Sequence, residues 1–175
     1  MDMMKAILML TILLVIFPIV MQGQEKEYNR ETESVSPHVD KILNGPITKE
    51  GLRKMPYKIW FNTNYKTYLV DTNTLKNIRK KKLKDLKILA FMGTWCHDSN
   101  REIPRLIRVM EELGKAEDLE LYGVDVNKTS ENGREGAYDI QKTPTIILLK
   151  DGKEIARILE EPEVSWEQEL EKILK

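Results

Sequence analysis

The sequence predicts an α/β fold in which helices flank a central mixed β-sheet. From residue 72 onward, segments with helical spacing alternate with short apolar runs of strand length. Strands that are joined through helices pair in parallel, whereas Asp151-Gly152, between two strand-like runs, is typical of an antiparallel hairpin. The 175 residues are enough for one domain with a single hydrophobic core.

Residues 47–71 are expected to form an N-terminal, aromatic-rich extension that packs on the main domain. Thr48 is a suitable N-cap for a first helix. At helical spacing, one face of the following segment carries aromatic side chains, namely Tyr57, Trp60, Phe61 and Tyr65. Such a face is typical of a packed core, and the alternative is an aromatic rim for a substrate or partner.

Residues 72–175 form the predicted main domain. We expect helices over 75–84, 99–114 and 131–139, and a last helix capped by Ser165. Pro104 lies inside the second of these and should kink it. Strands are expected over 87–93 and 119–126 and on both sides of Asp151-Gly152.

The N-terminal region is predicted to direct export. Residues 6–21 are apolar except for Thr11 and follow Lys5. The run is shorter than the roughly 20 apolar residues of a membrane span. Residues 1–23 are therefore interpreted as a signal peptide or, alternatively, as an N-terminal membrane anchor. Either interpretation places the protein in the periplasm or cell envelope, with residues 24–46 as a polar linker.

Charge and cysteine counts exclude several classes of function. With 28 basic and 28 acidic residues the net charge is zero, which argues against a nucleic-acid partner, and the basic run over 76–84 is expected to be a solvated helix face. Membrane contact is expected only through an uncleaved N-terminal segment. Cys96 is the single cysteine, so the chain has no internal disulfide. The chain also has only two histidines, so we expect it to bind no metal or cofactor.

Cys96 is the candidate catalytic residue. The segment Gly93-Thr94-Trp95-Cys96-His97-Asp98-Ser99 stands between an expected strand and an expected helix. A thiol in that place faces unpaired backbone N–H groups and the positive end of the helix dipole, which favour thiolate over thiol. The alternative is a buried, unreactive cysteine, but the polar and aromatic neighbours favour a reactive one.

Two segments of the predicted main domain, ILAFMGTWCHDSNREIP and TPTIILLKDG, carry motifs that lie far apart in the chain. With these motifs, residues 72–175 resemble the thioredoxin family. The first segment looks like the strand, active-site loop and kinked helix of a thioredoxin, with Trp95 before the nucleophile Cys96. TPTIILLKDG is similar to the second family motif, in which Pro144 is the cis-proline, preceded by Thr143. The exported form of this pattern resembles thioredoxin-like proteins of the bacterial envelope. The resemblance implies a thioredoxin-like fold and a substrate groove that includes Trp95, His97, Thr143 and Pro144.

The sequence departs from the family at the residues that, by the resemblance, would release a substrate from its mixed disulfide with the nucleophilic cysteine. Ser99 stands where a thioredoxin has its resolving cysteine, so the motif is CxxS. Ala90 replaces the buried acid of the family, and Leu121 replaces a nearby lysine. Ser99 could still donate a hydrogen bond to the Cys96 thiolate.

Two functions remain open at this point. The first is monothiol thiol–disulfide exchange, of the disulfide isomerase or deglutathionylation type, with client proteins that carry disulfides or thiols and an external thiol reductant as partners. The second is a non-catalytic module that binds proteins or peptides in the cis-proline groove. An exposed thiol in an oxidising compartment also allows a dimer linked through Cys96.

Overall fold

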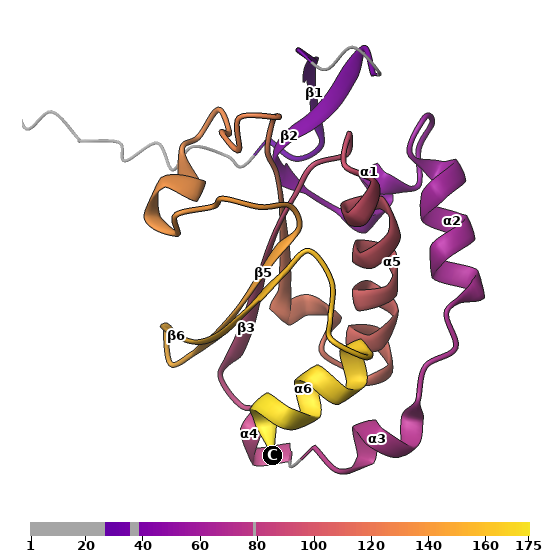
Figure 1. The fold of residues 1–175 in the computed structure, drawn as a ribbon, viewed down its shortest axis with the longest axis vertical. Coiled ribbons are helices and arrows are strands. Elements are labelled where there is room, and N and C mark those ends of the chain that lie inside the picture. The colour runs from indigo at the N-terminus through magenta and orange to yellow at the C-terminus, as the bar shows by residue number, and fades with distance from the viewer. Residues whose placement is uncertain (1–26, 36–38, 79) are drawn as a thin grey trace, which may run out of the picture.

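The computed structural model describes residues 27–35, 39–78 and 80–175, so the apolar run over 6–21 lies outside the described residues. Within this part of the chain, six strands form one mixed sheet in the order β1-β2-β4-β3-β5-β6 (Figure 1). The strands are β1 (Arg30–Glu33), β2 (Lys41–Ile47), β3 (Leu86–Met92), β4 (Leu119–Gly123), β5 (Thr145–Lys150) and β6 (Lys153–Leu159). β3 pairs in parallel with β4 and antiparallel with β5, as a mixed sheet requires.

Helices cover the sheet on one face and connect its strands. The α-helices are α1 (Lys49–Leu52), α2 (Lys58–Thr67), α3 (Thr72–Lys76), α4 (Lys80–Leu83), α5 (His97–Glu112) and α6 (Trp166–Leu174), with 3-10 turns η1 (Ala116–Asp118) and η2 (Arg134–Ala137). α5 packs on the sheet with α2 outside it and α6 beside it (Figure 1). The prediction of a helix over 131–139 corresponds to the short turn η2.

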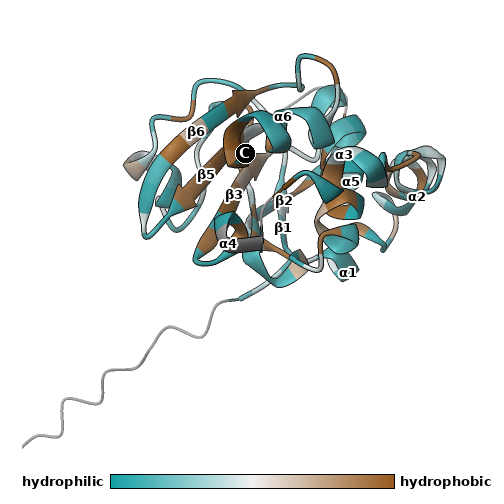
Figure 2. Cartoon of the chain, turned by 90° about the horizontal axis from the view of Figure 1, so that it is seen from below, coloured by the Kyte–Doolittle hydropathy of each residue, from teal (hydrophilic) through white to brown (hydrophobic). Residues whose placement is uncertain are grey.

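β3 separates two hydrophobic clusters. Residues at alternating positions of a strand point to opposite faces, and Ile88, Ala90 and Met92 face the cluster beneath α5 and α6. Leu89 and Phe91 face a smaller cluster on the other side, where they meet Tyr122, Val124, Ile140 and Ile147. Figure 2 shows the hydrophobic residues concentrated in β3 and β5, while the helices present hydrophilic faces to the solvent.

The prediction of a polar linker is wrong for residues 30–33 and 41–46, which lie in strands. β2 is buried from Ile42 to Ile47 and pairs antiparallel with both β1 and β4. The segment Asn44-Gly45-Pro46 has the composition of a turn, so the local sequence does not predict the strand. β2 changes partner there: β1 pairs with residues 41–44 and β4 with residues 45–47. Pro46 therefore has a strand partner on one side only, and its carbonyl accepts from Asn29 N at 2.8 Å.

The single helix expected over 75–84 is replaced by two short helices. α3 begins earlier, at Thr72, because the Asp71 carboxylate accepts hydrogen bonds from the backbone N–H groups of Asn73 and Thr74. It ends at Lys76, and α4 begins at Lys80. By contrast, the caps predicted at Thr48 and Ser165 are present, and Asp151-Gly152 forms the hairpin turn with positive φ at both residues.

The extension packs on α5, as its aromatic face predicts. Phe61 is 1% exposed and stacks on Tyr65 at 5.6 Å between ring centroids. Pro104 lacks the N–H that would bind the carbonyl of Asn100 in a regular helix. The side-chain amide of Asn64 in α2 donates to that carbonyl at 3.0 Å. α2 therefore satisfies the backbone group that Pro104 leaves open.

Replacement of Phe61 by alanine tests whether the extension belongs to the core. Phe61→Ala should lower the free energy of unfolding by about 3–5 kcal/mol, because it opens a cavity between α2 and α5. Ile59→Ala in the same helix is the matched control, because Ile59 is 65% exposed and should change stability by less than about 0.5 kcal/mol. Denaturant titration measures both, and equal effects would contradict the packing described.

Candidate functional site

Cys96 stands at the junction of β3 and α5. It is the N-cap residue of α5, with extended backbone angles (φ −93°, ψ 126°), and its carbonyl accepts from Asn100 N at 3.0 Å. The side chain is partly exposed and makes no capping hydrogen bond. The thiol therefore lies at the open N-terminus of α5, the helix of 16 residues, where backbone N–H groups and the helix dipole favour a negative charge.

The segment Thr143-Pro144 lies opposite the thiol. The Cys96 Sγ donates to the Thr143 carbonyl at 3.1 Å, across 47 residues of sequence. The peptide bond between Thr143 and Pro144 is cis, and the Pro144 carbonyl accepts from Glu160 N at 2.7 Å. The structure thus brings together Cys96, Thr143 and Pro144, which the two sequence motifs place far apart.

Trp95, the residue before Cys96, is held through its indole by the segment after β4. Its indole Nε1 donates to the Val124 carbonyl at 3.0 Å, and the Lys128 ammonium lies 5.3 Å from its ring. A Cβ atom on Gly93 would come within 2.5 Å of the indole. The Trp95 ring can therefore take this place only because residue 93 has no side chain.

Ser99 is fully buried one turn after Cys96. Its Oγ accepts from Gly93 N at 3.2 Å, so it ties the loop to the first turn of α5. This contact gives Ser99 a positioning role in the loop. The predicted hydrogen bond from Ser99 to the Cys96 thiolate stays a prediction.

The polar residues after Cys96 differ in how firmly they are held. The His97 side chain is 88% exposed, and its Nδ1 lies 3.7 Å from Asp98. Asp98 is held by Arg101 at 2.8 Å, and Arg101 also binds Glu161 at 2.6 Å, after the end of β6. The same guanidinium pairs with the buried carboxylate of Glu102, which raises the pKa of Arg101. The His97 side chain is thus largely exposed to solvent, whereas Asp98 belongs to an ionic network with Arg101.

The interior beneath the loop is apolar. Ala90 of β3 and Leu121 of β4 are partners in the sheet register, and both are buried in the main cluster. These are the positions at which the resemblance expects an acid and a lysine. Neither residue can accept or donate a proton, so these two positions supply no base beneath Cys96.

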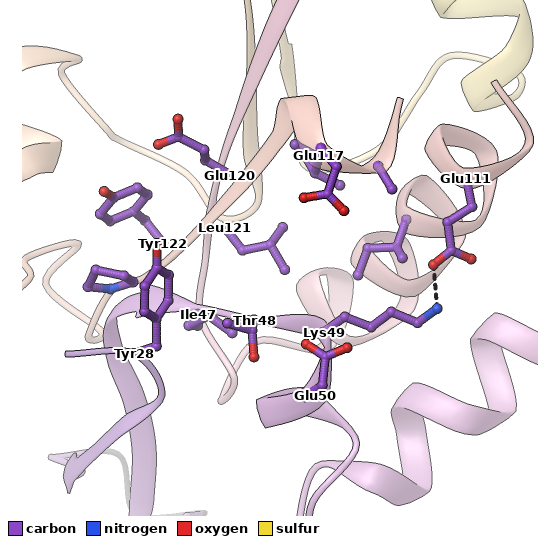
Figure 3. A pocket seen from close by; sticks show the side chains of 14 residues that line it. Tyr28, Ile47, Thr48, Lys49, Glu50, Glu111, Glu117, Glu120, Leu121 and Tyr122 are labelled. Carbon is purple, nitrogen blue, oxygen red and sulfur yellow. Dashed lines mark hydrogen bonds and ion pairs between the residues drawn. The ribbon is translucent and has the colours of Figure 1, made fainter. Parts of the chain in front are cut away.

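A separate cavity of about 530 Å³ opens on another part of the molecule (Figure 3). Tyr28 and Tyr122 line it at one side, and the ion pair between Lys49 and Glu111 lies at the other. Its lining includes none of the residues predicted for the site. In the part of the chain that the structure describes, no cluster of three or more His, Cys, Asp or Glu side chains is arranged for a metal.

Sequence reasoning missed several residues that hold the site. Val124 and Lys128 contact Trp95 from beyond β4, and Thr94 accepts a hydrogen bond from the backbone of β2. Arg101 joins α5 to the segment after β6. Thr94 and Arg101 flank the motif, but their partners are distant in sequence, and no local pattern indicates such contacts. Over residues 27–35, 39–78 and 80–175, no helix has the length and apolarity of a membrane span.

Fold and site together define a thiol-bearing α/β protein with its cysteine at a helix N-terminus. The thioredoxin family model matches residues 66–174. The thioredoxin of Listeria monocytogenes is 30% identical over 74 residues, 42% of this chain and 68% of the relative. That of Mycobacterium tuberculosis is 32% identical over 72 residues, 41% of this chain and 59% of the relative. The chain belongs to the thioredoxin family.

Solved structures of thioredoxins are also similar to this chain. Oxidized thioredoxin O2 of Arabidopsis thaliana has a TM-score of 0.40 at 23% identity, over 59% of this chain and 86% of the other. Oxidized mitochondrial thioredoxin 3 of Saccharomyces cerevisiae has a TM-score of 0.38 at 22% identity, over 63% of this chain and 96% of the other.

Substitution of Gly93 tests how the loop holds Trp95. Gly93→Ala should displace the indole, because the new methyl group would overlap the ring, and the bond to the Val124 carbonyl should be lost. We expect a loss of about 1–3 kcal/mol in stability and faster quenching of Trp95 fluorescence by iodide, measured with Trp60 and Trp166 replaced by phenylalanine. Gly136→Ala is the matched control, since a Cβ there meets no atom within 4 Å. An unchanged quenching rate in Gly93→Ala would contradict this geometry.

Proposed function

We propose that the protein performs monothiol thiol–disulfide exchange, with Cys96 as the nucleophile. The observation that carries the proposal is the 3.1 Å contact between Cys96 Sγ and the carbonyl of Thr143, next to cis Pro144. It places the partly exposed thiol beside the Thr143-Pro144 backbone, where the resemblance to the family implies a groove for an extended client segment. Family membership supports a redox role, and the single cysteine agrees with a monothiol mechanism.

The first step forms a mixed disulfide. The Cys96 thiolate attacks one sulfur of a client disulfide, the client S–S bond breaks, and the second client sulfur leaves as a thiolate. One disulfide replaces another, so no electrons are lost or gained overall. Cys96 is the N-cap residue of α5, and a helix N-terminus is a favourable place for a negative charge such as that of the attacking thiolate.

The second step requires a thiol from outside the chain. An external thiolate, or another cysteine of the same client, attacks the client sulfur of the mixed disulfide and releases the Cys96 thiolate. With a second client cysteine the result is disulfide isomerisation, and with a glutathionylated client it is deglutathionylation. Ser99 cannot form a disulfide, and the pair Ala90–Leu121 offers no base for a resolving thiol.

The alternative is a non-catalytic module that binds clients in the same groove. The loss of the resolving thiol and of the internal base together favours it, because a binding protein needs neither. The two functions differ in one measurable respect: only an exchange protein forms a covalent adduct at Cys96 that a thiol reverses.

A glutathionylated peptide tests the proposal. The reduced protein should gain the mass of one peptide or one glutathione at Cys96 in intact-protein mass spectrometry, and added reduced glutathione should remove it. Cys96→Ser should reduce adduct formation to background, because the serine hydroxyl is not ionised at neutral pH. The non-catalytic alternative is supported if the wild-type protein binds the peptide without an adduct.

Restoring a resolving cysteine tests the second step. Ser99→Cys should release the peptide without external thiol and form an internal disulfide with Cys96. Lys153→Cys is the matched control, because it adds a thiol at the hairpin turn, at the opposite end of the sheet from the Cys96 loop. Equal release by the two variants would show that proximity to Cys96 has no role.

We propose further that the protein is exported to the periplasm or cell envelope. The apolar run over 6–21 and the preceding Lys5 support this location. Expression of the full chain in a bacterial host, followed by fractionation and N-terminal sequencing, should give an envelope protein, cleaved near residue 23 or anchored intact. Recovery of the intact chain in the cytosol would oppose the proposal.

A further inference from the structure

We infer that Thr94 is a positioning residue, through which β2 holds the loop that carries Trp95 and Cys96. The inference rests on the proposed use of Cys96 as a nucleophile. It assigns a role in the site to β1 and β2, residues 30–33 and 41–47, which lie outside the segment matched by the family model.

The contact itself is a buried hydrogen bond. Leu43 N donates to Thr94 Oγ1 at 3.1 Å, across 51 residues of sequence. Leu43 is 2% exposed and Thr94 is 4% exposed, so water does not replace either partner. Pairing with β1 and β4 holds β2 in place, and the bond transmits the position of β2 to the residue directly before Trp95.

The backbone of β2 comes unusually close to the end of β4. A Cβ atom on Gly123 would lie 2.2 Å from the Leu43 carbonyl oxygen, so this approach requires glycine. Directly after it, Val124 N donates to the Met92 carbonyl at 2.9 Å, at the end of β3. β2, β3 and β4 therefore meet where the loop begins.

The same hairpin holds the segment on the other side of Trp95. The Asn44 side-chain oxygen accepts from Glu131 N at 2.9 Å, and Arg30 forms an ion pair with the Glu131 carboxylate at 2.7 Å. This segment, after β4, brings the Val124 carbonyl and the Lys128 ammonium to the indole. The β1–β2 hairpin thus contacts both Thr94, directly before Trp95, and the segment after β4 that holds the Trp95 indole.

Valine in place of Thr94 separates positioning from stability. Thr94→Val keeps the shape of the side chain but removes the acceptor for Leu43 N, whereas Thr94→Ser retains it. Thr48→Val is the control. It removes a threonine hydroxyl that accepts from Gly51 N at 3.1 Å and from the Asn29 side-chain amide at 3.0 Å, directly after β2 and away from the loop. Stability of each variant is measured by denaturant titration.

The readouts are the alkylation rate of Cys96 by iodoacetamide and its exchange rate with a glutathionylated peptide. Thr94→Val should slow exchange by roughly tenfold, since a displacement of the reacting group by about an ångström can lower the rate by up to about 10²-fold. The same variant should also change the alkylation rate of Cys96. Thr94→Ser should restore both rates to within about twofold of wild type, and Thr48→Val should leave both unchanged at a similar loss of stability.

Wild-type rates in folded Thr94→Val, or equal slowing in Thr48→Val, would overturn the inference. If the wild-type protein is alkylated but does not exchange, the proposed function fails, and the alkylation rates alone still decide the positioning role. If Thr94→Val does not fold, Thr94→Ala takes its place. It also removes the acceptor for Leu43 N, and wild-type rates for it reject the inference.

Discussion

β3 is the strand on which the positions of all other elements depend. It lies between β4 and β5, and each residue from Ile88 to Met92 is at most 1% exposed. Backbone hydrogen bonds on both edges and side-chain packing on both faces leave it no freedom to shift, because a slip of one residue would exchange the two faces. The loop from Gly93 to Cys96 therefore starts from a fixed point, and α5 starts from the end of that loop. The direction of the helix N-terminus at the thiol follows from the burial of β3.

Segments that are far apart in sequence converge on this loop from three directions. Thr143 reaches Cys96 from the start of β5, Val124 reaches Trp95 from the end of β4, and Leu43 reaches Thr94 from β2. Each contact involves a backbone group of the approaching segment. Two glycines make room beside these contacts, because a Cβ atom on Gly93 would overlap the Trp95 indole and one on Gly123 would overlap the Leu43 carbonyl. The site is thus held by backbone contacts that are specific to this sheet order.

The sequence allowed prediction of those parts of the fold that are specified by local patterns. β3, α5, the hairpin at Asp151-Gly152 and the cap at Ser165 carry their signals within a few residues. β2 does not, since its partner changes at Asn44-Gly45-Pro46 and those residues are typical of a turn. In the site, Cys96 and Pro144 were recognisable from their motifs. The roles of Thr94 and Val124 were not, because a hydrogen bond across 51 or 29 residues has no local signal.

The apolar pair Ala90–Leu121 connects the interior of the sheet with the chemistry proposed for Cys96. A buried acid and lysine at these positions would have to lose their hydration, at a cost that their mutual attraction only partly offsets. Alanine and leucine avoid that cost and pack in the main cluster. What is lost is a proton acceptor beneath the thiol, which matters only when a second thiol of the same chain must be ionised. Ser99 removes that second thiol as well, so the two replacements are consistent with each other. In the proposed exchange, Cys96 therefore performs the attack on a client disulfide, and an outside thiol performs the release.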